Sequence, residues 1–101
     1  MPYIIYAIDN EGMGGIREGL RQEHRVHLKS AGKKLLGSGA LLNDEGTEII
    51  GGMSILDTND KSEAQKFADE DPYSIAGLRK ETIVVRWRRR WVEGEFFADI
   101  D

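Results

Sequence analysis

The order of strand-like and helix-like segments along the chain is the feature that most limits its fold. Stretches rich in β-branched and aromatic residues indicate strands, and apolar residues at three- and four-residue steps indicate helices. Strands are predicted at residues 3–8, 35–42, 49–56 and 82–91, and helices at residues 15–34 and about 60–70. This β-α-β-β-α-β order predicts an α+β, ferredoxin-like fold, an antiparallel sheet with two helices on one face.

A chain of 101 residues is too short for two domains, because neither half could bury enough apolar surface to offset its conformational entropy. We therefore expect one domain at residues 1–92, followed by a tail at residues 93–101. The helices leave one sheet face bare, so a second copy is expected to cover it, giving a homodimer or larger homo-oligomer built as a dimeric α+β barrel. In the acidic tail, Phe96 and Phe97 either dock on a neighbouring subunit or belong to a frayed end.

The composition excludes several classes of function. The chain has no cysteine, which rules out disulfides, thiolate nucleophiles and cysteine-based metal centres and agrees with a cytoplasmic location. The N-terminus lacks a basic signal-peptide region, and no apolar run approaches the ~20 residues that cross a bilayer. A net charge of -4 argues against nucleic-acid binding, whose usual footprint is a basic face. We predict neither a nucleic-acid nor a membrane partner.

The segment from Arg86 to Trp91 is a local exception, because it interleaves cations with aromatic rings as nucleic-acid-binding segments do. On a strand, however, alternation sends three of its arginines to one face and both tryptophans to the other. This placement favours a solvent-exposed sheet edge, whose tryptophans pack and whose arginines meet acidic groups of a partner.

His24 stands where a core residue is expected in the first helix. On a helical wheel it falls inside the inward sector of about 100° that is formed by Ile16, Leu20, His27, Ala31 and Leu35. A lone histidine on an apolar face is more often a core residue bonded to a carbonyl than a catalytic group. Arg17 lies at the edge of the same sector, and its permanent charge requires either a carboxylate or an anionic ligand nearby.

A carboxylate is available at a rigid break in the chain, Asp71 in Asp71-Pro72-Tyr73. An aspartate held by a following proline can accept a hydrogen bond from one imidazole nitrogen and so raise the basicity of the other. The sequence leaves two interpretations of Asp71 open. In the first it orients His24, and in the second it is an ordinary residue of a helix terminus or turn. Ser74 and Tyr73 could donate hydroxyl hydrogen bonds to a ligand, and Tyr73 could equally be a packing residue.

His27 forms a His-x-x-His pair with His24, a spacing that can bind a metal ion. No aspartate or glutamate stands at helical spacing on the same inward face, which argues against a metal site. The sequence also shows no phosphate-binding loop, dinucleotide fingerprint or serine nucleophile elbow. We therefore predict neither a metal nor another cofactor.

The combination of these residues resembles the YciI-related family over most of the chain. The resemblance rests on Arg17, Arg21-x-x-His24-Arg25-x-x-Leu28, Leu35-Leu36-x-x-Gly39-x-Leu41-Leu42, the strand ending at Leu56, Asp71-Pro72-Tyr73, Gly77-Leu78 and Arg86-Trp87. It implies the dimeric ferredoxin-like fold and a His–Asp pair at His24 and Asp71. The chain departs from the family at His27 and Ala40, where members often carry an aromatic residue and a proline, and in its extension from Arg88 to Asp101.

These features lead to three hypotheses of function. The family includes a dehydrochlorinase of bacterial aromatic degradation, and the resemblance implies a cofactor-free lyase that removes HCl from a chlorinated hydroxyhydroquinone. In that hypothesis His24 is the base, Asp71 orients it, Arg17 holds an anionic oxygen, and Ser74 and Tyr73 bind the substrate. The alternatives are a lactone isomerase of the muconolactone-isomerase type, and a non-catalytic small-molecule-binding module in which His24 and Asp71 form a structural pair.

Overall fold

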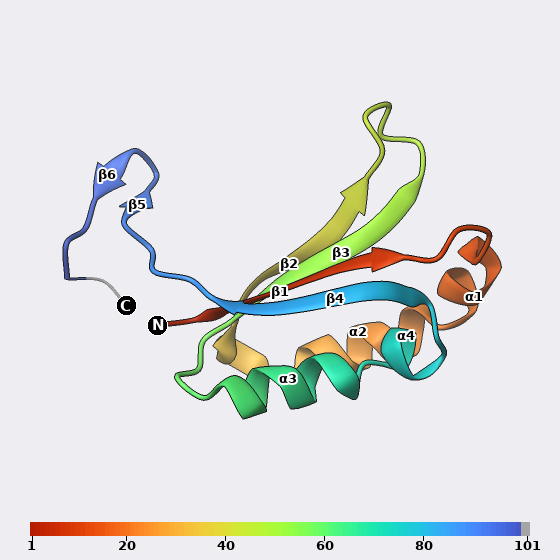
Figure 1. The fold of residues 1–101 in the computed structure, drawn as a ribbon, viewed down its shortest axis with the longest axis horizontal. Coiled ribbons are helices and arrows are strands. Elements are labelled where there is room, and N and C mark those ends of the chain that lie inside the picture. The colour runs from red at the N-terminus through yellow and green to blue at the C-terminus, as the bar shows by residue number, and fades with distance from the viewer. Residues whose placement is uncertain (100–101) are drawn as a thin grey trace.

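The computed structural model, which describes residues 1–99, has its helices packed on one face of an antiparallel sheet (Figure 1). The sheet has four strands in the order β2-β3-β1-β4, so β1 is central and pairs with both β3 and β4. Its strands are β1 (Tyr3–Asp9), β2 (Leu35–Leu42), β3 (Ile49–Leu56) and β4 (Arg79–Arg86). The helices are α1 (Gly14–Gly19), α2 (Arg21–Ser30), the 3-10 turn η1 (Gly32–Lys34), α3 (Lys61–Asp69) and α4 (Pro72–Ile75). The predicted α+β, ferredoxin-like fold is confirmed.

The core lies between the helices and the sheet face that strand alternation turns toward them. Along β1, every second residue from Tyr3 to Ala7 is buried. Leu56 of β3 and Ala64 of α3 close against Tyr3, and Phe67 packs beside them. Ala64 is fully buried, and its small side chain lets α3 lie close to the sheet.

The first helix is divided, where the sequence predicted one helix over residues 15–34. α1 and α2 meet at Leu20, whose backbone angles (φ -105°, ψ 4°) are not helical. Three glycines weaken α1, because glycine loses the most backbone freedom in a helix. Gly32, in the left-handed region at φ 58°, follows the end of α2. As a result, Arg17 lies on its own short helix and His24 on the longer one.

The last strand of the sheet begins and ends earlier than the predicted residues 82–91. β1 begins at Tyr3, which pairs with Arg86, so the β1–β4 ladder stops there. Beyond it, β5 (Trp91–Val92) and β6 (Glu95–Phe96) form a separate hairpin that stands off the sheet (Figure 1). The prediction that the arginine-rich segment alternates along a sheet edge is therefore wrong beyond Arg86.

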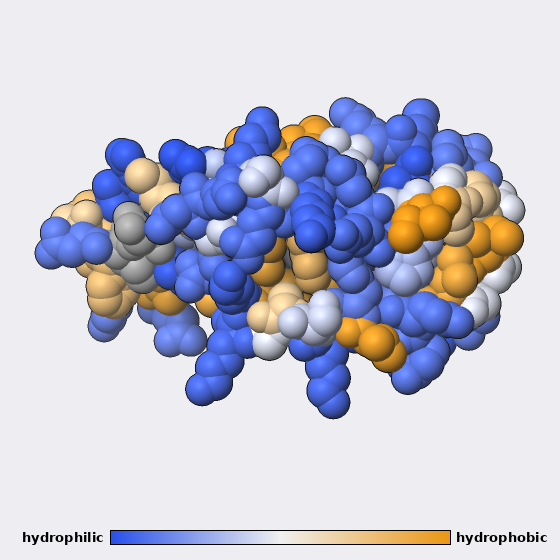
Figure 2. Space-filling view, turned by 90° about the horizontal axis from the view of Figure 1, so that it is seen from below, coloured by the Kyte–Doolittle hydropathy of each residue, from blue (hydrophilic) through white to orange (hydrophobic). Residues whose placement is uncertain are grey.

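The two faces of the fold differ in what they expose. The outer surface of the helix layer is mostly hydrophilic, with scattered apolar patches (Figure 2). On the opposite face of the sheet, the cross-strand neighbours Met53, Tyr6 and Ile83 form an apolar row with exposures of 37%, 36% and 43%. The helices lie on the other face of the sheet (Figure 1), so they do not cover this exposed row. The homodimer that would bury it stays a prediction.

Position 51 of β3 must be glycine because the backbones of β3 and β1 approach closely there. It is buried, and a Cβ atom at this position would lie 2.1 Å from the carbonyl oxygen of Ala7 on β1. That distance is far inside van der Waals contact, so any side chain would force β1 and β3 apart.

Replacing Gly51 with alanine is expected to lower the free energy of unfolding by about 1–3 kcal/mol, the usual cost of forcing extra atoms into a packed interior. Urea unfolding of the variant and the wild type measures this difference. Gly39→Ala on β2 is the matched control, because nothing lies within 4 Å of a Cβ atom there. Equal stability of Gly51→Ala and the wild type would contradict the close approach.

Candidate active site

Asp71 occupies the short connection between α3 and α4. Its backbone is extended (φ -60°, ψ 129°), the conformation that the following Pro72 favours, and its side chain caps α4. Oδ1 accepts a hydrogen bond from the backbone N–H of Tyr73 at 3.0 Å. Asp71 therefore stands at a helix terminus, one of the two positions that the sequence left open, and the one-turn helix α4 follows it.

His24 of α2 faces this carboxylate from the neighbouring helix. Its Nδ1 lies 2.9 Å from Asp71 Oδ1, and its ring stacks on Tyr73 with the centroids 4.0 Å and the planes 16° apart. In a neutral imidazole, an Nδ1–H bond to the carboxylate leaves the lone pair on Nε2, which can accept a proton from a ligand. The structure thus brings the two predicted partners within hydrogen-bond distance.

The carboxyl group of Asp71 is held in its ionised form. Burial by itself would raise its pKa, but hydrogen bonds from His24 and from the Tyr73 N–H, together with the charge of the protonated form of His24 and that of Arg79, bring the pKa below its usual value. Arg79 Nη2 lies 4.0 Å from Asp71 Oδ2. An ionised carboxylate at this position stabilises the positive charge that the imidazole acquires when it accepts a proton.

A second carboxylate, that of Asp9 at the end of β1, holds two arginines beside this pair. Arg17 of α1 donates to Asp9 Oδ2 from Nε at 2.9 Å and from Nη2 at 2.8 Å. Arg79 at the start of β4 donates from Nη1 to Asp9 Oδ1 at 2.8 Å. The three side chains are at most 12% exposed, so solvent screens these ion pairs little. Asp9 thereby ties α1 and β4 to the end of β1.

Asp9 and Arg79 are the site residues that sequence reasoning missed. The permanent charge of Arg17 predicted an anion, and the structure supplies the carboxylate of Asp9. An acidic residue directly after a predicted strand, close to an arginine-bearing helix, was the available signal for Asp9. No local signal marked Arg79, because its pairing with a residue 70 positions away depends on the register between β1 and β4.

Tyr73 connects the arginines to the histidine. Its side chain is 1% exposed, and the guanidinium carbons of Arg17 and Arg79 lie 4.6 Å and 5.2 Å from the centroid of its ring. The same ring stacks on His24. Of the two roles that the sequence left open for Tyr73, packing is the one that the geometry displays.

All of the predicted site residues line one cavity of about 300 Å³ between the helices and the sheet. The half-buried Ser74 borders it, and its backbone N–H donates to the Asp71 carbonyl at 2.8 Å. Arg21 and Arg25 join Arg17 and Arg79 in the lining. The volume lies at the lower end of small-molecule sites, roughly 300–1,000 Å³, and the excess of arginines favours a small anionic ligand.

His27 is half-buried against α3 and does not line this cavity. Its Nε2 lies 2.8 Å from the backbone carbonyl oxygen of Phe67, and its ring stacks on the Phe67 ring at 4.4 Å. The bond satisfies a carbonyl that the helix packing would otherwise leave poorly solvated. Within residues 1–99, no group of three or more histidine, aspartate or glutamate side chains is placed to hold a metal ion.

Comparison with known proteins identifies the family. The YCII-related domain matches residues 1–88 of the chain. The chain belongs to the YCII-related family. The resemblance seen in the sequence is therefore confirmed, and residues 89–101 extend beyond the part that the family domain covers. No curated protein sequence matches the chain.

Two solved structures resemble this YCII-related chain. The first is 5-chloro-2-hydroxyhydroquinone dehydrochlorinase (TftG) from Burkholderia phenoliruptrix AC1100, in complex with 2,5-dihydroxybenzoquinone. It is 27% identical, with a TM-score of 0.79, and the match covers 87% of this chain and 94% of that one. The second, At3g17210 from Arabidopsis thaliana, is 8% identical with a TM-score of 0.48, covering 91% of this chain and 97% of that one.

The similarity to TftG relates this YCII-related chain to an enzyme that binds a small quinone. No helix within residues 1–99 combines the length and the apolar character needed to cross a bilayer.

The lowered pKa of Asp71 predicts a specific acid sensitivity. Because the folded state holds this carboxyl below the unfolded value of about 3.9, its contribution to stability is complete above that pH and is lost as the pH falls through the folded pKa. The difference in free energy of unfolding between wild type and Asp71→Asn should therefore shrink below about pH 4. Urea unfolding at a series of acid pH values measures this stability difference. A difference that does not depend on pH would contradict the lowered pKa of Asp71.

Replacing Asp9 with asparagine is expected to lower the free energy of unfolding by about 3–5 kcal/mol, because two shielded arginines lose their counter-charge. Urea unfolding at neutral pH measures the loss. Asp44→Asn, on the exposed turn between β2 and β3, is the matched control and should change stability by less than about 0.5 kcal/mol. A similarly small effect of Asp9→Asn would show that the cluster does not hold the fold together.

Proposed function

We propose that this chain is a cofactor-free lyase that eliminates HCl from a small chlorinated hydroxyhydroquinone. The observation that carries the proposal is the contact of His24 Nδ1 with Asp71 Oδ1 at 2.9 Å, on the wall of a cavity of about 300 Å³. The relative TftG, whose match covers most of both chains, is a dehydrochlorinase of such a compound and binds 2,5-dihydroxybenzoquinone. A single substituted ring of this kind is compatible with the size of the cavity.

The proposed elimination needs only proton transfers. His24 Nε2 removes a hydroxyl proton and returns it to the ring carbon that carries chlorine, which gives a keto tautomer. Removal of a second hydroxyl proton then forms the second carbonyl group while the C–Cl bonding electrons leave with chloride. The ring loses one proton and one chloride ion in total, so the products are a hydroxybenzoquinone and HCl and the balance requires no external oxidant.

The other site residues have complementary roles in this proposal. Asp71 keeps the Nδ1 proton of His24 in place and offsets the charge of the imidazolium. Arg17 uses Nε and Nη2 on Asp9, so Nη1 is its donor toward an anionic substrate oxygen. Ser74 offers its hydroxyl to a second oxygen, and Tyr73 holds the His24 ring by stacking.

The proposal also covers the cellular compartment and the oligomeric state of the enzyme. The enzyme acts in the cytoplasm, as the absence of cysteine favours, during degradation of chlorinated aromatic compounds. Its working form is a homodimer or larger homo-oligomer, because a second copy would cover the apolar row on the open sheet face.

Replacing His24 with asparagine should reduce chloride release from a chlorinated hydroxyhydroquinone by roughly 10²–10⁴-fold, since the general base is lost. The variant loses the hydrogen bond to Asp71, so its free energy of unfolding should fall by about 1–3 kcal/mol while the chain still folds, and chloride release is compared per folded molecule. His27→Asn is the matched control on the same helix, because it removes the bond to the Phe67 carbonyl and should lower stability while chloride release per folded molecule persists. Undiminished chloride release by His24→Asn would contradict the role of His24.

A panel of chlorinated hydroxyhydroquinones, followed by a chloride-selective electrode, tests the substrate class. Chloride release from none of them would reject the dehydrochlorinase assignment. Isomerisation of an unsaturated lactone, monitored by ultraviolet absorbance, would then support the isomerase alternative with the same base. Loss of thermal stability in His24→Asn without turnover of any substrate by the wild type would favour a structural His24–Asp71 pair in a binding module.

A further inference from the structure

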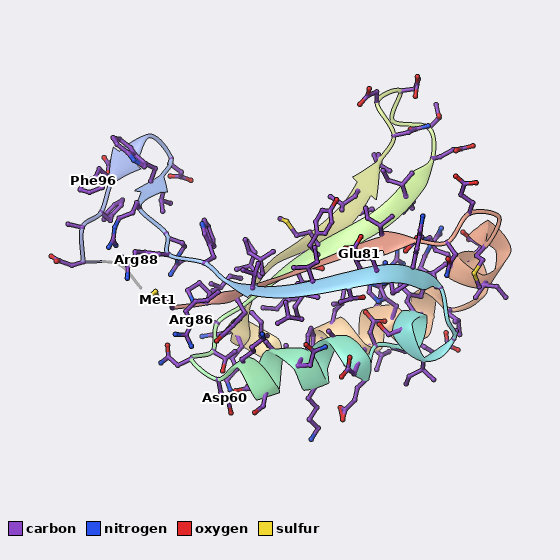
Figure 3. All side chains as sticks on the ribbon, in the orientation of Figure 1. Met1, Asp60, Glu81, Arg86, Arg88 and Phe96 are labelled. Atoms are coloured by element: carbon purple, nitrogen blue, oxygen red, sulfur yellow. The ribbon has the colours of Figure 1, made fainter. Side chains whose placement is uncertain are left out.

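The C-terminal arm, defined here as residues 87–99, lies almost wholly outside the family domain at residues 1–88. It leaves the sheet where β4 ends at Arg86, and the backbone N–H of Trp87 donates to the Pro2 carbonyl at 2.9 Å. Arg88 and Phe96 both lie beyond the end of the sheet (Figure 3). The start of the arm is therefore fixed beside the first strand, and the rest projects away from the body of the fold.

The arm is an ordered hairpin that carries apolar side chains on its surface. Glu93 and Gly94, at φ 50° and 81°, form the tight turn between β5 and β6, and the N–H of Phe97 donates to the Arg90 carbonyl at 2.7 Å. The rings of Trp91 and Phe96 pack at 5.3 Å. Exposures are 67%, 37%, 55% and 40% for Trp91, Val92, Phe96 and Phe97. An isolated hairpin is marginally stable, so such a surface indicates a contact that covers it.

The open face of the sheet is a matching apolar surface on the same chain. It carries the row of Met53, Tyr6 and Ile83, and beside it Val85, which is 47% exposed. The β2–β3 hairpin and the C-terminal arm both rise from the sheet on the side away from the helices (Figure 1). The open face therefore lies between two projections, one at each end of the strands.

These two projections carry opposite charges. Near its start the arm carries three consecutive arginines, Arg88 to Arg90, of which Arg88 is exposed. The turn between β2 and β3 exposes the acidic residues Asp44, Glu45 and Glu48. A second copy can be placed over the open face with its strands turned end to end. The basic arm of each copy then lies against the acidic turn of the other copy. Such an arrangement is the self-complementary interface of a two-fold dimer.

We propose that the C-terminal arm clasps a second copy of this chain. The hairpin packs on the open sheet face of that copy, and the arginine segment lies against its acidic turn. At their exposures, the side chains of Trp91, Phe96 and Phe97 present roughly 300 Å² on one arm. Two arms therefore add on the order of 600 Å² to the contact between the sheet faces, a large share of the roughly 1,600 Å² that a stable interface buries.

The test uses the full chain and measures the dimer dissociation constant by sedimentation equilibrium. The double variant Trp91→Ser/Phe96→Ser should raise this constant by at least about tenfold, with the far-ultraviolet circular dichroism of the body unchanged. Val26→Ser is the matched control, because Val26 is a 61% exposed apolar residue on α2, away from the arm and from the open sheet face. It should leave the constant unchanged.

An unchanged constant in the double variant would overturn the proposal, and so would a wild-type chain that is monomeric at every concentration. Charge reversal tests the placement of the arm. Arg88→Glu should weaken the dimer, and the further change Glu45→Arg in the same chain should restore it. If Glu45→Arg fails to restore the dimer that Arg88→Glu weakens, the arm does not lie against the acidic turn.

Discussion

The carboxylate of Asp9 is the interaction on which the arrangement of the site depends. It bonds Arg17 and Arg79, which come from a helix and a strand at opposite ends of the sequence, and both guanidinium groups lie close to the ring of Tyr73. Two arginines packed this closely would repel one another without an anion between them. Because Tyr73 in turn stacks on His24, the position of the imidazole depends on a charge cluster that it does not touch.

The two histidines of α2 show how neighbouring positions on one helix acquire different chemistry. His27 bonds to a backbone carbonyl and stacks on Phe67, which makes it a packing residue between α2 and α3. His24 bonds instead to an ionised carboxylate and borders a cavity. A carbonyl fixes a ring without changing its charge state, whereas a carboxylate stabilises the imidazolium that forms on proton uptake. Proton-transfer chemistry at this helix is therefore proposed for His24 alone.

Much of the fold could be predicted because its signals are local. A period of two residues located the strands, and apolar residues at three- and four-residue steps located the helices; the order of these elements selected the ferredoxin-like topology. The errors arose where a boundary depends on a distant partner or on weak propensity. β4 ends at Arg86 because β1 begins opposite it at Tyr3, and the first helix divides at Leu20 after a glycine-rich turn. Neither boundary is visible in the periodicity of the segment itself.

The sequence by itself determined which groups are available for chemistry: a histidine on an inward helix face, an aspartate fixed by a proline, and an arginine that required an anion. Only the tertiary structure decided how they are paired. In the structure Arg17 pairs with Asp9, and Arg79 lies between the carboxylates of Asp9 and Asp71. The physical reason is that helical periodicity fixes the direction of a side chain on its own element, whereas a hydrogen bond between elements depends on strand register and helix packing.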